Sequence, residues 1–154
     1  MPDLNLKDID ADDLGRRLKG MGVNLLCPDP LTYAPELSRI MALELIRVDA
    51  FFALLSWRSP PEINTLIQLH ADKSYANNPY HACLKEAGMR GVGVELRLFD
   101  IDPDAAAKRA EATDGWQVLQ HPADKEHGIR EAFILDPMGY CWVLSVPLPD
   151  GKSA

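Results

Sequence analysis

Two segments of the sequence have the same predicted order of secondary structure. Each begins with a strand, continues with Asp-Pro at the start of a helix and ends in three strands; the Asp-Pro pairs are Asp29-Pro30 and Asp102-Pro103. An Asp side chain accepts hydrogen bonds from a first helical turn, and Pro is favoured at the first helical position. A solenoid needs three or more repeats for stability. Two copies therefore predict an α+β domain of two βαβββ modules, at about residues 21–71 and 91–148.

The predicted elements of the two modules correspond in type and order. Residues 1–20 carry acids early and bases late, as suits a helix dipole, and are predicted as an N-terminal helical extension. The domain covers 21–148, with a linker at 72–90 that includes a short helix around 81–87, and a tail at 149–154. The predicted strands are 22–27, 44–48, 51–57, 63–69, 92–98, 116–120, 132–135 and 141–146, and the predicted module helices are 30–43 and 105–113.

Residues 127–148 predict a β-hairpin that closes the second module. Two short apolar strands are joined by Asp136-Pro137-Met138-Gly139. Pro presets a φ of roughly −65° at the second position of a type I turn, and Gly is favoured at the end of such a turn.

This hairpin resembles the last two strands of the vicinal oxygen chelate superfamily, which contains glyoxalase I, extradiol dioxygenases and bleomycin-binding resistance proteins. The matching positions are Gly128, Arg130, Asp136, Pro137, Gly139 and Tyr140. Together with the paired modules, the resemblance covers nearly all of the chain after the N-terminal segment. It implies curled mixed sheets around a cleft, and a homodimer. Whether the modules pair within one chain or between two chains stays open.

The resemblance also specifies where a metal ligand would lie. Metal-dependent members hold a divalent ion that binds two neighbouring substrate oxygens as a Lewis acid. Their pattern places one ligand in the first strand of each module and one in the last strand. These positions are Gly22, Glu95 and Val143, while a shifted register would replace Glu95 by Gly93. Only Glu95 can bind a metal, so we expect no cofactor, with a divalent ion as the alternative.

The four histidines give no further support for a metal. His70, His81, His121 and His127 are expected to be exposed near strand ends and in loops, and none has the spacing of a common metal motif.

The predicted ligand site is the strand face that carries these positions. Side chains alternate along a strand, so Leu26 and Cys141 share this face with the ligand positions. Such a face is apolar with a few polar groups, as small-molecule sites are. Phe52, Tyr140 and two tryptophans could stack on a flat ligand or simply pack in the core, whereas Trp142 has the opposite parity and should face a helix. The predicted ligand-binding residues are Asn24, Glu95, Arg97, Ser145, Val143, Trp57 and Trp116. The alternative for Glu95 and Arg97 is an ion pair.

The amino-acid composition limits the kinds of partner that the protein is expected to bind. The net charge of −7, without a basic cluster, argues against nucleic acid. The apolar runs are shorter than the roughly 20 residues of a membrane span, and residues 1–20 lack the apolar block of a secretory signal. We therefore expect a cytoplasmic protein without a membrane partner. Cys27, Cys83 and Cys141 show no Cys-x-x-Cys spacing, which indicates reduced thiols.

These observations and the resemblance favour a metal-free protein of the glyoxalase/bleomycin-resistance type that binds a small, partly aromatic compound. The acidic charge would favour a cationic ligand. The alternative is a metal-dependent lyase, isomerase or dioxygenase, in which Glu95 acts as a base or as the metal ligand. A structural dimer without a ligand site is the third possibility, so the sequence leaves open whether the chain is an enzyme.

Overall fold

The chain forms two compact units in the computed structural model, which describes residues 10, 13, 16, 22–58, 64–81, 83 and 88–149. The first unit comprises residues 1–35 and 44–76, and the second comprises 36–43 and 77–154. The predicted helices at 1–20 and 81–87 lie outside the described residues except at positions 10, 13, 16, 81 and 83, and residues 150–154 of the tail lie outside them too. Within the described ranges, no helix is long and apolar enough to cross a membrane.

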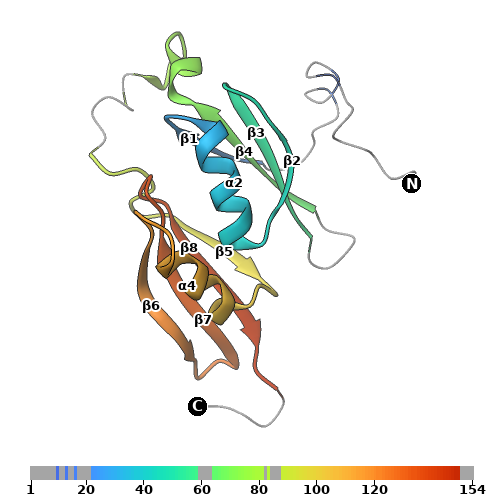
Figure 1. Ribbon diagram of the computed structural model, residues 1–154, viewed down its shortest axis with the longest axis vertical. Helices are drawn as coiled ribbons and strands as arrows, with labels where there is room; N and C mark the ends of the chain where they lie inside the picture. The colour runs from blue at the N-terminus through green and yellow to red at the C-terminus, as the bar shows by residue number, and fades with distance from the viewer. Residues whose placement is uncertain are drawn as a thin grey trace. The chain divides into compact units, whose positions relative to one another are not determined.

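The first module has the predicted order of one strand, one helix and three strands. Its sheet A has the strand order β1-β4-β3-β2, in which β1 runs parallel to β4 and the other pairs are antiparallel (Figure 1). A short 3-10 helix, η1 (Asp72–Tyr75), follows β4. The elements are β1 (Val23–Cys27), α2 (Pro30–Met41), β2 (Glu44–Val48), β3 (Phe52–Arg58) and β4 (Asn64–Ala71).

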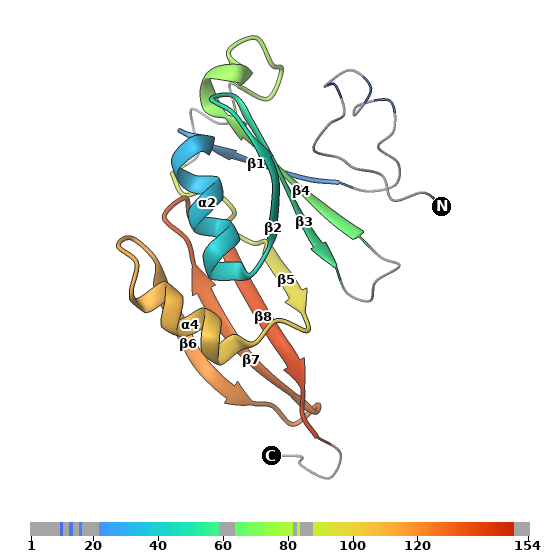
Figure 2. The ribbon, with the colours of Figure 1, turned by 45° about the vertical axis from the view of Figure 1, so that its right-hand side comes forward.

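The second module repeats this topology. Sheet B has the order β5-β8-β7-β6, again with its first strand parallel to its last (Figure 2). The elements are β5 (Glu95–Phe99), α4 (Pro103–Glu111), β6 (Gln117–Asp124), β7 (Ile129–Leu135) and β8 (Cys141–Pro147). The two sheets and their helices confirm the predicted α+β fold of two βαβββ modules.

Three strand ends differ from the prediction by three or more residues. Strand β7 begins at Ile129, three residues before the predicted strand 132–135. Strand β6 continues to Asp124, although Pro122 predicts a loop; β6 is an edge strand with register shifts around Gln120, and such irregular edges accept proline. Strand β5 begins only at Glu95, because Gly91 and Gly93 have φ values of 69° and 87° and form a turn before it.

Both predicted helix caps are confirmed. Asp29 accepts hydrogen bonds from the Leu31 amide at 3.1 Å and the Thr32 hydroxyl at 2.7 Å, and the bond from Thr32 contributes most to lowering the pKa of Asp29. Asp102 accepts hydrogen bonds from the amides of Asp104 and Ala105 at 2.9 and 3.1 Å. The Asp-Pro pairs therefore start α2 and α4 as the sequence predicts.

The turn between β7 and β8 is built around the buried carboxylate of Asp136. One oxygen accepts hydrogen bonds from the amides of Met138 at 2.8 Å and Tyr140 at 3.0 Å, and the other accepts one from Trp142 Nε1 at 2.7 Å. Gly139 has a φ of 90°, and a Cβ there would lie 2.9 Å from the Arg90 carbonyl oxygen. The predicted turn therefore depends on both its Asp and its Gly.

Helix α4 covers one face of sheet B, which we call the core face. Arg130 on this face donates hydrogen bonds to both carboxylate oxygens of Asp104 in α4, at 2.7 and 2.8 Å. Trp142 shares the parity of Arg130 and is fully buried, so its predicted orientation toward a helix is confirmed. The fully or almost fully buried residues of this face are Leu98, Ala132, Ile134, Trp142 and Leu144, and those of α4 are Pro103, Ala106, Ala107 and Ala110.

We predict that Asp136→Ala lowers the free energy of unfolding by about 3 kcal/mol, because it leaves two buried donors and one part-buried donor without their charged acceptor. Asp114→Ala removes an exposed carboxylate from the loop after α4 and is the control, with an expected change below about 0.5 kcal/mol. Urea unfolding followed by tryptophan fluorescence measures both. Equal effects of the two variants would contradict the role assigned to Asp136.

Candidate functional site

The face of sheet B opposite α4 carries the candidate site, and we call it the site face. The strand register places its residues in rows that cross all four strands. These rows are Glu95, Cys141, Leu135 and Gln117; Arg97, Val143, Phe133 and Gln120; and Phe99, Ser145, Glu131 and Ala123. Four of the residues predicted for the second module, Glu95, Arg97, Val143 and Ser145, thus come together on one face, from β5 and β8.

A polar network crosses this face. Arg97 donates one hydrogen bond to Glu95 at 2.9 Å and another to Glu131 at 2.6 Å. Lys125 Nζ lies 3.7 Å from the second oxygen of Glu131 and donates to Gln120 Oε1 at 3.0 Å. We call these five residues the Arg97 network. It contains two acids and two bases, so its formal charge is balanced.

The two acids of the network differ in environment. The side chain of Glu131 is 7% exposed, whereas that of Glu95 is 49% exposed. Burial alone would lower the pKa of Arg97, but its hydrogen bonds to Glu131 and Glu95 outweigh this effect and raise the pKa. Glu131 is therefore a fixed, buried anchor for the guanidinium, and Glu95 is a partner that water reaches.

The floor between the polar groups is apolar. Val143 is 1% exposed, and Phe133 beside it in the same row is half-buried. Phe99 at the edge is 58% exposed. Cys141 lies next to Glu95, and burial, followed by the charge of Glu95, raises the pKa of its thiol. The thiol is therefore held in its protonated, weakly nucleophilic form.

In the first unit, one face of sheet A also carries both polar and aromatic side chains. Asn24 donates a hydrogen bond to the Tyr75 hydroxyl at 2.5 Å. The ring of His70 makes edge contacts with Phe52 and Tyr75, with centroids 5.0 and 5.8 Å away. The expectation that His70 is exposed is wrong, because it lies half-buried within β4.

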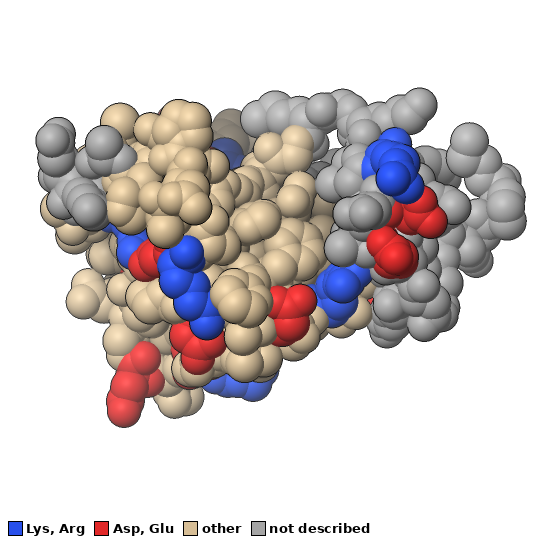
Figure 3. All heavy atoms as spheres, turned by 90° about the horizontal axis from the view of Figure 1, so that it is seen from above, with Lys and Arg blue, Asp and Glu red and all other residues tan. Residues whose placement is uncertain are grey.

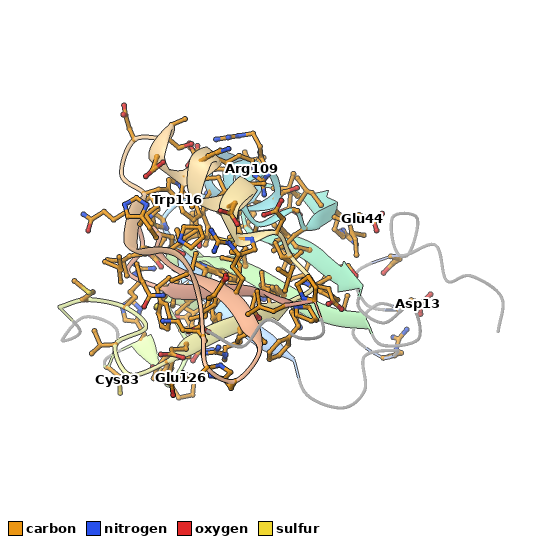
Figure 4. The ribbon with its side chains drawn as sticks, turned by 90° about the horizontal axis from the view of Figure 1, so that it is seen from below. Asp13, Glu44, Cys83, Arg109, Trp116 and Glu126 are labelled. Atoms are coloured by element: carbon orange, nitrogen blue, oxygen red, sulfur yellow. The ribbon has the colours of Figure 1, made fainter. Side chains whose placement is uncertain are left out.

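The two predicted tryptophans lie away from these faces. Trp57 has the strand parity of the buried Leu55 and Ala53, so it points to the opposite side of sheet A from Phe52. Trp116 is buried beside α4 and donates through Nε1 to Glu36 at 3.3 Å (Figure 4). Both belong to packed regions, the alternative that the sequence leaves open for aromatic residues.

The sequence prediction missed three members of the Arg97 network. Glu131 precedes the predicted strand 132–135, Gln120 ends the predicted strand 116–120, and Lys125 lies in the predicted loop between these strands. One signal was present: Glu131 alternates with Phe133, so a longer strand would have put an acid on the ligand face.

The predicted metal positions carry no ligand set. Gly22 has no side chain to coordinate a metal, Val143 is aliphatic, and the carboxylate of Glu95 is paired with Arg97. Within the part of the chain that the structure describes, no group of three or more His, Cys, Asp or Glu side chains is arranged to hold a metal ion.

On the surface seen in Figure 3, acidic and basic side chains lie close to one another instead of gathering by sign.

We predict that Glu131→Ala lowers the free energy of unfolding by about 2 kcal/mol, because Arg97 and Lys125 lose their buried counter-ion. Glu95→Ala removes the same kind of group from an exposed pair and should cost below about 0.5 kcal/mol. Urea unfolding compares the two variants. A larger loss for Glu95→Ala would contradict the assignment of Glu131 as the anchor.

We predict that His70 makes stability depend on pH. Burial lowers the pKa of His70, against the opposing charge of Asp49. The unfolded chain then binds the proton more tightly, so the contribution of neutral His70 is complete above a pH of about 6.5 and is lost as the pH falls below it. Urea unfolding at about pH 7.5 and pH 5 should show this loss in the wild type and a smaller one in His70→Asn. His121→Asn replaces an exposed histidine and is the control. Between the two pH values this variant should lose as much stability as the wild type.

Comparisons with known proteins give structural but no sequence matches. No family model matches the chain, and no curated protein matches it. A glyoxalase/bleomycin resistance protein/dioxygenase family enzyme from Burkholderia phytofirmans PsJN has a TM-score of 0.62 at 18% identity, covering 82% of this chain and 96% of that one. A glyoxalase-related enzyme from Fulvimarina pelagi has a TM-score of 0.62 at 15% identity, covering 89% and 98%. Lactoylglutathione lyase from Agrobacterium tumefaciens has a TM-score of 0.54 at 16% identity, covering 83% and 92%.

Proposed function

We propose that this chain, which has the fold of the vicinal oxygen chelate superfamily, binds a small organic ligand without a metal ion. The row of Arg97, Val143, Phe133 and Gln120 is the observation that carries the proposal. It combines an apolar floor with polar groups at its two ends, which is the usual composition of a small-molecule site.

The chemistry of the same row does not fit a divalent ion. Val143 occupies the metal-ligand position of the last strand. Its neighbour in the row is Arg97 of β5, which carries a guanidinium. A permanent positive charge there would repel a second cation. Glu95 is already paired with Arg97, so a metal would have to compete with an existing ion pair for its only carboxylate.

Binding without catalysis needs only this surface. The half-buried thiol of Cys141 has a raised pKa that keeps it protonated, and the acids of the network are held by bases. A lyase, isomerase or dioxygenase remains the alternative, since two of the solved structures with this fold are described as a family enzyme and a lactoylglutathione lyase. We also propose a homodimer, because modules of this superfamily often pair across two chains.

Native mass spectrometry of protein purified without chelator tests the metal and the assembly together. We expect the mass of a dimer without a bound ion, and we expect no stoichiometric binding when Zn²⁺, Ni²⁺ or Mn²⁺ is added. One tightly held ion per chain that is lost in Glu95→Gln would replace the proposal with the enzyme alternative. A monomer would contradict only the proposed assembly.

Protein NMR with 2-naphthalenemethanol, a neutral flat compound, tests the binding surface. We expect saturable shifts of the amides of Val143 and Phe133 and of their neighbours in β5, β7 and β8. The amides of α4 are the internal control, because this helix covers the opposite face. Absence of any shift on sheet B, with this compound and with its charged analogues, would contradict a small-molecule site on this face.

A further inference from the structure

We propose that the ligand of the site face carries a carboxylate, and that Arg97 binds this carboxylate in place of that of Glu95. The inference rests on the proposed function and specifies its ligand class. It treats Glu131 as the positioning residue that holds the guanidinium while the outer partner is exchanged.

The first argument is a surplus of hydrogen-bond donors. A guanidinium has five N–H groups, and Arg97 uses one toward Glu95 and one toward Glu131. The remaining three have no acceptor among residues that the structure describes. A carboxylate is planar, and its two oxygens can accept two parallel hydrogen bonds from the N–H groups of a guanidinium.

A second donor without an acceptor lies in the same row. Gln120 Nε2 is buried and has no hydrogen-bond partner within the described part of the chain, while Gln120 Oε1 accepts from Lys125. The strand register is shifted on both sides of Gln120, and such bulges redirect side chains near binding sites. Donors at both ends of the row therefore favour a ligand with acceptor oxygens.

The third argument is that the two partners of Arg97 are unequal. Glu131 is buried, is 2.6 Å from Arg97 and is also close to Lys125, so its position is fixed from two sides. Glu95 is half-exposed, is 2.9 Å from Arg97, and has no other partner among the described residues. An exposed ion pair contributes little to stability, so Glu95 can leave Arg97 at small cost.

Exchange also keeps the number of carboxylates that contact Arg97. The guanidinium is hydrogen-bonded to two carboxylates before the exchange and to two afterwards, one of them from the ligand. The net charge of −7 favours cations over the whole molecule, but this long-range effect is screened by salt. By contrast, the contact between the ligand carboxylate and Arg97 acts at short range. The half-buried Phe133, beside Val143 in the row of Arg97, then offers an apolar surface to the remainder of the ligand.

The experiment compares three compounds of one shape: 2-naphthoate, 2-naphthalenemethanol and 2-naphthylmethylamine. Dissociation constants come from NMR titration of the wild type. We expect 2-naphthoate to bind at least about tenfold more tightly than the other two, because only it pairs with the guanidinium. Arg97→Gln should remove this preference, whereas Arg97→Lys, which keeps the charge but loses the planar pair of donors, should only weaken it. The spectra of both variants report whether sheet B stays folded.

Two charge-matched variants test the exchange itself. Glu95→Gln removes the competing carboxylate and should tighten 2-naphthoate binding by about threefold to tenfold. Glu126→Gln removes the same charge from the exposed turn between β6 and β7 and should leave the constant unchanged. Equal tightening in both variants would show an effect of net charge alone and would overturn the exchange.

The outcomes separate this inference from the proposed function. If the neutral or cationic compound binds as tightly as 2-naphthoate, or if Arg97→Gln keeps the preference, the carboxylate assignment fails while small-molecule binding stands. If none of the three compounds shifts the amides of sheet B, the proposed function fails, and the inference fails with it.

Discussion

The buried carboxylate of Asp136 determines how the second module is arranged. Its three hydrogen bonds fix the turn between β7 and β8, the two inner strands of sheet B. Because side chains alternate along a strand, a shift of one residue in this pairing would exchange the two faces of the sheet. Trp142 would then leave the core face, and Val143 would leave the site face. The turn thus sets the composition of a surface that it does not touch.

The site face depends in turn on Glu131. A buried carboxylate is costly unless it is paired, and Glu131 meets this requirement by holding Arg97 on one side and Lys125 on the other. These two bases belong to different edges of the sheet, since Arg97 lies in β5 and Lys125 follows β6. One acid on an inner strand therefore orders the polar groups of both outer strands.

The fold could be predicted from the sequence because its signals are local. Asp29-Pro30 and Asp102-Pro103 act through hydrogen bonds to residues two or three positions away, and Asp136-Pro137-Met138-Gly139 acts within its own turn. The alternation of β5 and β8 was enough to bring Glu95, Arg97, Val143 and Ser145 onto one face. Only two of the five residues of the Arg97 network were predicted, because Glu131 and Gln120 reach that face through strand pairing and bulges. Trp57 and Trp116 show the same limit, since aromatic character does not specify which side of a sheet a residue faces.

Strand β6 also affects how the molecule meets other copies of itself. A regular edge strand presents a row of free N–H and C=O groups on which another strand can assemble into an aggregate. In β6 the row is interrupted by register shifts on both sides of Gln120, and Pro122 contributes no N–H group. The irregularity that turns Gln120 toward the site face therefore also makes this edge a poor template for amyloid-like growth.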